Sequence, residues 1–492
     1  MVFSEGKMKV GKLLAMILTV SMVVPVCACK PKNESESESS TRESSKITTK
    51  ESTATTSTSA STETEPTAEP TTPSEVKDES EEPLVVYGYI KDFKKSISSY
   101  FPDTQIDYVF IEPKDYFTAL SEALQNGEKK PDVFMMDKDH LQDYSNGNKT
   151  LGIEEVGISP DELSDQFEYT YKASVGAGGA IKALSYDLAP SAVIYNRALA
   201  KTYLGSAEPS EISAKVADWD SILELARSVN LNTEGTIKLV ADRQQIHSIF
   251  WAAHTSSWVK DKKIAVGSDF DKYFLIQESL HAESLTGEKT VGSEEWTQYI
   301  NAGQAVLFFG SLKTAADVIG YVPGHKEDIK EETRSTETSA DGTTETTEEI
   351  PETGWSIVPA PTATYDGGTW LMVAHTCDKK ATAGQFLRTL TMDKTVMTDL
   401  AVKGYFVNSR SIMAQCAADP NFACDFLGGQ NPFAILVPEA EKIQIADDPD
   451  VNRCAENEIR KLLTAYLAQD IETFAEVKEQ FIVGMEELLG LA

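Results

Sequence analysis

The chain has 492 residues and a formal net charge of −32, so it is long enough for two or three domains and strongly acidic. Half of that charge lies in two segments rich in Ser, Thr and Glu, residues 33–83 with −9 and residues 326–352 with −7. Phosphate contacts need clustered Lys and Arg, and the sequence has no such basic stripe. The composition therefore argues against nucleic acid as a partner.

Residues 1–29 have the features of an export signal. Three lysines within residues 7–12 form a basic region, and the apolar run at residues 13–24 is too short to span a membrane comfortably. The run leads into residues 26–29, VCAC, which resemble the bacterial lipobox: an aliphatic residue, two small residues and a lipidated cysteine. An ordinary secretory signal, cleaved near Ala28, is the alternative. The resemblance implies that acyl chains on Cys29 anchor the mature protein in a membrane.

Residues 30–83 are composed mainly of Ser, Thr, Glu and Pro, with almost no apolar side chains. Such a segment cannot bury enough apolar surface to offset the entropy of ordering it, so we expect a disordered tether. A flexible chain of roughly 50 residues spans on the order of 40 Å, which would hold a folded domain clear of the surface. A lipidated cysteine followed by a tether indicates the extracellular face of the cell membrane in a Gram-positive bacterium.

The first folded segment alternates strands and helices. The pattern predicts strands at 84–90, 105–111 and 131–137, separated by helices at 92–100 and 115–126. This alternation is typical of an α/β fold with a parallel sheet. Ligands of open parallel sheets bind beyond the carboxyl ends of the strands, so Tyr89 and Asp137 are candidate binding residues, with loop or core positions as the alternative.

Residues 182–199, KALSYDLAPSAVIYNRAL, predict two strands on either side of a stiff bend. Pro190 lacks a backbone N–H and biases Ala189 toward an extended conformation, so the connection should not be helical. We interpret this stretch as the chain crossing from one lobe to another. Tyr186 and Asp187 stand just before the bend, where a hinge would meet a cleft.

Five motifs carry a resemblance to a known family. They are KKPDVFMMD at 129–137, ALSYDLAPSAVIYNRALA at 183–200, AVLFFGS at 305–311, WSIVPAP at 355–361 and GGTWLMV at 367–373. Each motif is weak alone, but their order and spacing resemble the extracellular solute-binding proteins of ABC importers, and among these the sugar-binding group, family 1. The resemblance covers roughly residues 84–490.

The resemblance implies an α/β fold with two lobes, of the periplasmic-binding-protein-like type II class, with an interlobe cleft and crossing hinge strands. The first lobe would comprise residues 84–186 and 357–400, and the second lobe residues 187–356 and 401–492. The acidic segment 326–352 is then a disordered insert in the second lobe. Apolar residues at helical spacing further predict helices at 219–229, 380–390, 456–467 and 474–489.

A sugar presents apolar ring faces and hydroxyl groups, so its binding site pairs aromatic rings with carboxylates and amides. Residues of these types near the crossings give nine candidates for ligand contact. They are Asp187, Tyr186, Trp370, Trp251, Trp355, Tyr89, Asp137, Phe309 and Tyr405. Packing in the core is the alternative for the aromatic residues.

The implied function is the capture of a mono- or oligosaccharide between the lobes and its delivery to the permease subunits of a membrane importer. The chain would act as a monomer, without catalytic residues, metal or cofactor. The sequence carries no HExxH, GxSxG or CxxC motif, yet the paired carboxylates of a glycoside hydrolase meet only in the fold. A lipid-anchored carbohydrate-active enzyme therefore stays an alternative, as does a surface adhesin or a sensor-coupled binding protein.

Four cysteines follow the tether: Cys377, Cys416, Cys424 and Cys454. An exported chain permits disulfides, and Cys416 with Cys424 is the pair nearest in sequence. A local disulfide and separate buried thiols both stay open.

Overall fold

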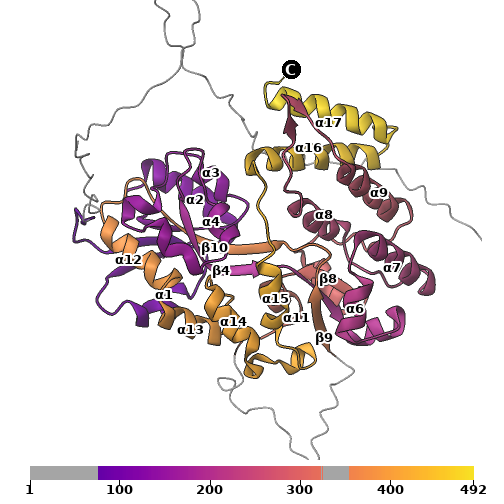
Figure 1. The fold of residues 1–492 in the computed structure, drawn as a ribbon, viewed down its shortest axis with the longest axis horizontal. Helices are drawn as coiled ribbons and strands as arrows, with labels where there is room; N and C mark the ends of the chain where they lie inside the picture. The colour runs from indigo at the N-terminus through magenta and orange to yellow at the C-terminus, as the bar shows by residue number, and fades with distance from the viewer. Residues whose placement is uncertain (1–75, 323, 325–353, 492) are drawn as a thin grey trace, which may run out of the picture.

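The computed structural model describes residues 76–322, 324 and 354–491 (Figure 1). The predicted signal peptide with Cys29, most of the predicted tether and the insert at 326–352 lie outside the described residues. Among the helices that are described, none is both long and apolar enough to cross a membrane. The chain forms two α/β lobes joined by strands that cross between them, as the resemblance implied (Figure 1).

The first lobe is built on a five-stranded sheet with the order β2-β1-β3-β10-β4. Its strands are β1 (Leu84–Gly88), β2 (Ile106–Phe110), β3 (Val133–Met136), β4 (Ala183–Pro190) and β10 (Tyr365–Val373). Strand β1 pairs in parallel with β2 and β3, whereas β10 runs antiparallel to both β3 and β4. The predicted alternation of strands and helices is confirmed, with the first three strands two or three residues shorter than expected.

The helices that pack around this sheet come from two separate stretches of the chain, one before β4 and one after β10 (Figure 1). They are α1 (Phe93–Ile97), α2 (Pro113–Asn126), α3 (Leu141–Ser145), α4 (Glu168–Lys172), α12 (Lys380–Thr391) and α13 (Lys394–Val402). All four residues of β3 are buried, as expected for a central strand that is covered on both faces. Helix α12 packs on β4 although the strands of the second-lobe sheet lie between them in sequence. The first lobe is therefore assembled from two distant parts of the chain.

The second lobe has a three-stranded antiparallel sheet with the order β8-β5-β9. Its strands are β5 (Ala192–Asn196), β8 (Leu307–Gly310) and β9 (Trp355–Pro359), and its helices are α5 (Arg197–Leu199), α6 (Pro209–Lys215), α7 (Trp219–Asn232), α8 (Arg243–Ala252), α9 (Ser268–Ala282), α10 (Glu294–Asn301) and α11 (Leu312–Ile319). Helix α7 begins where it was predicted, because Asp218 caps it by accepting a hydrogen bond from the backbone of Ser221 at 2.8 Å.

The C-terminal region adds two helices to the core shared by the two sheets and two helices to the second lobe. They are α14 (Arg410–Ala418), α15 (Pro432–Ala440), α16 (Pro449–Leu467) and α17 (Phe474–Leu488), and a short hairpin of β6 (Val259–Lys260) and β7 (Lys263–Ile264) lies beside α17. Helix α16 starts seven residues before the predicted 456, because Asp448 caps it and Pro449 occupies its first position. Helices α8, α9, α16 and α17 share an apolar cluster that includes Trp258, Phe274 and Phe481.

Helices α14 and α15 pack together, and their apolar side chains join a core that contains residues of both sheets. The shared core links the two lobes, so the lobe boundaries at residues 186/187, 356/357 and 400/401 stay a prediction from the sequence. The four described cysteines form no disulfide, so Cys416 and Cys424 are separate thiols in this structure.

The last residues of the predicted tether contact the first lobe. The carboxylate of Asp78 accepts hydrogen bonds from the backbone N–H groups of Ala381 at 2.7 Å and Thr382 at 3.1 Å, at the start of α12. No side chain within α12 or next to it caps this end of the helix. Asp78 thus supplies the cap from about 300 positions away in the chain.

We expect replacement of this cap to destabilise the fold. The Asp78→Ala variant should lose about 1 kcal/mol of unfolding free energy, the usual contribution of a helix N-cap. Urea unfolding of the variant and of Glu81→Ala, an exposed neighbour, would measure the difference. Equal stabilities for the two variants would show that the Asp78 contact contributes nothing.

Candidate ligand-binding site

The antiparallel pair of β4 and β10 forms the crossing between the lobes. In its register Thr369 lies opposite Asp187, and the next residue, Trp370, lies opposite Ser185. Tyr186 is therefore an extra residue in β4, and a β-bulge of this kind bends a strand and re-aims its side chains. Tyr186 is only 2% exposed and packs in the apolar core, whereas the half-buried Asp187 lines an open cavity.

Two adjoining cavities of about 330 and 270 Å³ surround this aspartate, and we call them together the cleft. Both are lined by Asp187, Leu188, Ala189, Lys313 and Thr369. The first lobe adds Tyr89, Ile90, Pro113, Phe117 and Asp137, α11 adds Leu312 and Ala316, and the chain after α13 adds Lys403, Gly404, Tyr405 and Phe406. The cleft thus receives side chains from both lobes at the carboxyl ends of β1 and β3, where ligands of such sheets bind.

The carboxyl group of Asp187 is strongly perturbed by its place in the cleft. Burial raises its pKa to about 7, and the ammonium group of Lys313 lowers it again only in part. No hydrogen bond reaches this carboxylate from the residues described here. A desolvated carboxylate without a donor is costly, so a ligand that brings hydroxyl or amine donors would be stabilised at this position.

Tyr89 contributes an aromatic face and a phenol group to the cleft. Its ring meets that of Tyr116 edge to face, with centroids 5.0 Å apart. Burial raises the pKa of the Tyr89 phenol, with a hydrogen bond to Thr369 acting in the opposite direction. The phenol therefore stays protonated at neutral pH and can donate a hydrogen bond.

Asp137 is held in place by its neighbour His140. The Asp137 Oδ1 atom accepts a hydrogen bond from the backbone N–H of His140 at 3.0 Å and lies 2.8 Å from the Nδ1 atom of the ring. The hydrogen bond to Asp137 raises the pKa of His140. The His140 ring in turn stacks on Phe117 at a centroid distance of 3.6 Å. This wall of the cleft therefore combines an oriented carboxylate with an aromatic surface.

The glycine pair in β10 lets the two crossing strands approach each other. Gly368 has φ of 115°, and a Cβ atom there would lie 3.1 Å from both the carbonyl oxygen of Asp187 and the ring of Trp370. Only glycine adopts this conformation readily and leaves that space free. Gly367 and Gly368 therefore serve a tight backbone bend in β10.

The remaining predicted contacts lie away from the cleft. Trp370 is 1% exposed, and its indole donates to the carbonyl of Thr170 at 2.9 Å. Trp251 stacks on Trp258 inside the second lobe. Two more are placed in or beside the second-lobe sheet: Phe309, buried in β8 against Trp219, and Trp355, at the end of β9 far from the crossing. Asp187, Tyr89, Asp137 and Tyr405 are the predicted residues that the fold brings together around the cleft.

Sequence reasoning missed several residues of the cleft, namely Lys313, Thr369, Phe117, Asp366 and Lys403. A signal for Lys313 was present, because Ser311 and Thr314 form a capping box that starts α11 directly after β8. A helix that begins at the carboxyl end of a strand points its first turn into the cleft of an α/β lobe. The other four carry no comparable local signal.

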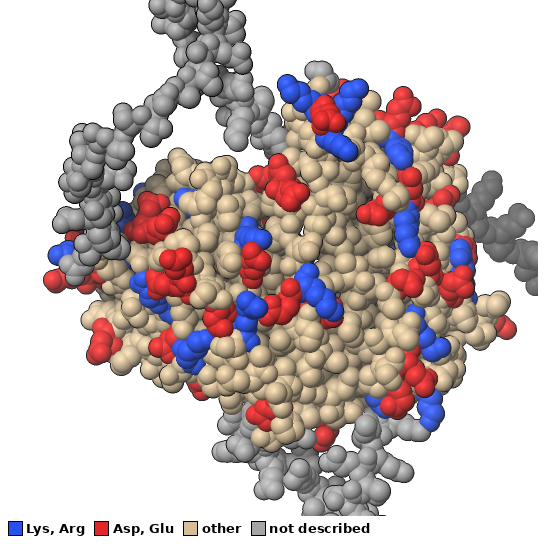
Figure 2. Space-filling model, viewed as in Figure 1, with Lys and Arg blue, Asp and Glu red and all other residues tan. Residues whose placement is uncertain are grey.

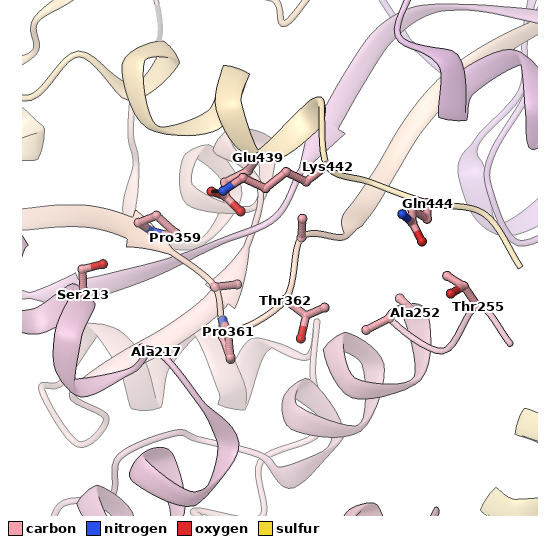
Figure 3. Close-up of a pocket in the computed structure, with 13 residues that line it drawn as sticks. Ser213, Ala217, Ala252, Thr255, Pro359, Pro361, Thr362, Glu439, Lys442 and Gln444 are labelled. Atoms are coloured by element: carbon pink, nitrogen blue, oxygen red, sulfur yellow. Dashed lines mark hydrogen bonds and ion pairs between the residues drawn. The ribbon is translucent and has the colours of Figure 1, made fainter. Parts of the chain in front are cut away.

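Two further cavities lie near the crossing. One, of about 460 Å³, is lined by Lys138 and Gln142 of the first lobe and by α16. The other, of about 510 Å³, lies between α15 above and the ends of α6 and α8 below, with the crossing residues 359–363 between them (Figure 3). The larger one has small side chains and an ion pair of Glu439 with Lys442 at 2.7 Å, and takes no residue from the β1 or β3 ends. We therefore place the candidate site in the cleft.

No cluster of three or more His, Cys, Asp or Glu side chains suited to a metal ion occurs in residues 76–322, 324 and 354–491. The cleft itself offers carboxylates, ammonium groups, hydroxyls and aromatic faces. This donor set is suited to a polar organic ligand.

Two α/β lobes with crossing strands and a cleft between them define a two-lobe solute-binding protein. The chain belongs to the bacterial extracellular solute-binding protein family, whose family model matches residues 87–397. This is a family of binding proteins. No curated relative matches the chain in sequence.

Solved structures share the fold at low sequence identity. A crystal structure of an extracellular solute-binding protein of family 1 has 14% identity and a TM-score of 0.63, covering 82% of this chain and 99% of its own. The ABC transporter associated binding protein from B. animalis subsp. lactis Bl-04, in complex with β-1,6-galactobiose, has 17% identity and a TM-score of 0.56, covering 82% of this chain and 98% of its own. The GacH receptor of Streptomyces glaucescens, solved unliganded and with acarbose, has 12% identity and a TM-score of 0.58. That match covers 83% of this chain and 98% of the receptor.

The desolvation of Asp187 predicts a pH-dependent stability. Its folded-state pKa of about 7 lies above the ordinary value of 3.8, so its contribution to stability is present below pH 4 and is lost as the pH rises through 7. The Asp187→Asn variant cannot ionise. The unfolding free energy of Asp187→Asn relative to the wild type should therefore rise, by on the order of 1–3 kcal/mol, as the pH increases from 4.5 to 8.

Urea unfolding at both pH values measures this difference. The Asp103→Asn variant, changed on an exposed loop, is the control. A constant offset between Asp187→Asn and the wild type across the range would contradict the burial of this carboxylate.

Proposed function

We propose that this chain is the substrate-binding lipoprotein of an ABC importer, which captures a mono- or oligosaccharide between its lobes and delivers it to a membrane permease. It acts as a monomer without a cofactor, held at the extracellular face of the membrane by acyl chains on Cys29. The single observation that carries the proposal is the bulge-directed carboxylate of Asp187 in a cleft lined by both lobes.

The chemistry of the cleft supports a sugar ligand. Carboxylates such as Asp187 and Asp137 accept hydrogen bonds from hydroxyl groups, and the rings of Tyr89 and Phe117 offer apolar faces for the C–H surface of a sugar ring. Solved relatives with the same fold are described in complex with β-1,6-galactobiose, acarbose and cycloalternan. These ligands belong to those proteins and indicate the class to be tested here.

The two-lobe arrangement supports transport. A ligand that touches both walls of the cleft favours the closed arrangement by its extra contacts, and a permease can read that arrangement. The lipid anchor is supported by the residues VCAC at 26–29 and the tether that follows them. The family assignment supports a location outside the cytoplasm.

Calorimetry against a panel of mono- and oligosaccharides tests the ligand class. We expect one or more sugars to bind, and Asp187→Ala to weaken binding by 10- to 100-fold, since a hydrogen bond to a charged group contributes about 1.5–3 kcal/mol. Asp103→Ala is the control and should bind as the wild type does. Failure of every sugar to bind would overturn the carbohydrate claim, and products released from an oligosaccharide would indicate an enzyme instead.

The anchor has its own test. Replacement of the predicted lipidated residue, Cys29→Ala, should move the protein from the membrane fraction to the culture medium or block its maturation. Western blotting of the two fractions measures this, with Cys424→Ala as a control far from the signal. A variant that stays fully processed and membrane-bound would rule out attachment through Cys29.

A further inference from the structure

A chain of polar contacts joins the lobes at a second place, away from the crossing strands. Arg453 of α16 lies 2.6 Å from the carboxylate of Asp143 in α3 and 3.0 Å from that of Asp450 on its own helix. Asn146, which follows α3, donates a hydrogen bond to Asp450. We call these four residues, Asp143, Asn146, Asp450 and Arg453, the α3–α16 bridge.

Helix α3 is fixed to the first lobe. Leu141, Tyr144 and Ser145 are buried, and the Tyr144 ring packs against Phe134 of the central strand β3. The carbonyl of Tyr144 also accepts a hydrogen bond from the hydroxyl of Thr150 at 2.9 Å. This end of the bridge therefore moves with the first-lobe sheet.

Helix α16 is fixed to the second lobe. The indole of Trp258 donates to the Oδ1 atom of Asn452 at 2.9 Å, and the buried ring of His247 in α8 lies 3.1 Å from a carboxylate oxygen of Glu456. Cys454, Ala455 and Ile459 enter the apolar cluster of α8, α9 and α17. Arg453 and Asp450 therefore move with the second lobe.

The bridge lies across a cavity from the crossing. The cavity of about 460 Å³ is lined by Tyr365 of β10, by Asp139 just before α3 and Gln142 within it, and by Arg453 and Glu456 of α16. In Figure 1 the start of α16 approaches α3 above β10 and β4. The cavity is bordered by the crossing through Tyr365 and by the bridge through Arg453. Separation of the lobes by bending at the crossing would pull the bridge apart.

In the bridge the charge of Arg453 lies between those of Asp143 and Asp450, and these side chains are partly exposed. The side chains of Arg453 and Asp143 are 26% and 50% exposed, so their attraction is modest and is screened by salt. Acidic and basic side chains are mixed on the face in Figure 2, so no broad field of one sign on that face drives the lobes apart or together. A local contact can then bias the balance between open and closed arrangements.

We propose that the α3–α16 bridge is a latch that holds the two lobes together in the absence of ligand. It must break before the lobes can separate by bending at the crossing and open the cleft to a solute. Removal of Arg453 shifts the unliganded protein toward the open arrangement, lowering the ratio of closed to open molecules by about two- to fivefold, as expected for one exposed ion pair.

Small-angle X-ray scattering of the unliganded full chain tests the latch. We expect Arg453→Gln to increase the radius of gyration, and 0.5 M NaCl to do the same to the wild type but little to the variant. The control is Arg227→Gln, which breaks an ion pair with Glu283 of similar exposure and 2.5 Å length inside the second lobe. Scattering of Arg453→Gln that matches the wild type and this control at low salt would overturn the proposal.

A double-mutant cycle separates a latch from a loss of helix stability. Asp143→Asn should open the lobes as Arg453→Gln does, and should add nothing in the Arg453→Gln background, because the two residues act through one contact. Additive effects would contradict the latch. Far-UV circular dichroism melting of each variant verifies that α16 stays folded. The measurement uses no ligand, so its outcome is independent of whether a sugar binds.

Discussion

The antiparallel pairing of β4 with β10 is the constraint on which the rest of the structure depends. It joins residues 183–190 to residues 365–373 and completes the first-lobe sheet with a strand that returns from the second lobe. Both strands continue into the second-lobe sheet as β5 and β9, which pair with each other in turn. The lobes are therefore tied by two adjacent strands, a connection that can bend but cannot slide without loss of register in both sheets.

The same pairing creates the polar centre of the cleft. An extra residue in β4 directs Tyr186 into the core and leaves Asp187 facing a cavity, and the flexible backbone of Gly368 allows the strands to meet closely there. A carboxylate in that position is partly desolvated before any ligand arrives, which is unfavourable for the unliganded fold. Such a cost is typical of sites whose polar groups are completed by a ligand.

The distribution of aromatic residues shows how the lobes divide their side chains between packing and binding. The largest rings, such as Trp370 and Trp296, are buried and stabilise the cores, where their area gives the greatest hydrophobic gain. The cleft instead takes tyrosine and phenylalanine rings from the end of β1, from α2 and from the segment after α13. Motion between the lobes then leaves the cores intact, because the cleft is lined by the crossing strands and by the segments beside them.

The sequence by itself determined the α/β class, the order of the first strands and helices, the crossing at residues 182–199 and the family. These follow from local periodicity, from proline and glycine chemistry and from the order of short motifs, all of which can be read along the chain. It also placed Asp187, Tyr89 and Asp137 near strand ends, which is where the cleft forms. The N-terminal signal and anchor were likewise predicted from sequence, and they lie outside the described residues.

Only the tertiary structure decided which side chains face the cleft. The bulge at Tyr186 exists because β4 pairs with a strand about 180 residues away, and no local pattern reports that register. The same holds for Trp370 and Trp251, whose burial depends on helices from other parts of the chain, and for Lys313, whose helix meets the crossing only after both sheets have formed. Local sequence fixes which residues enter a strand or helix, but the direction of each side chain depends on non-local pairing.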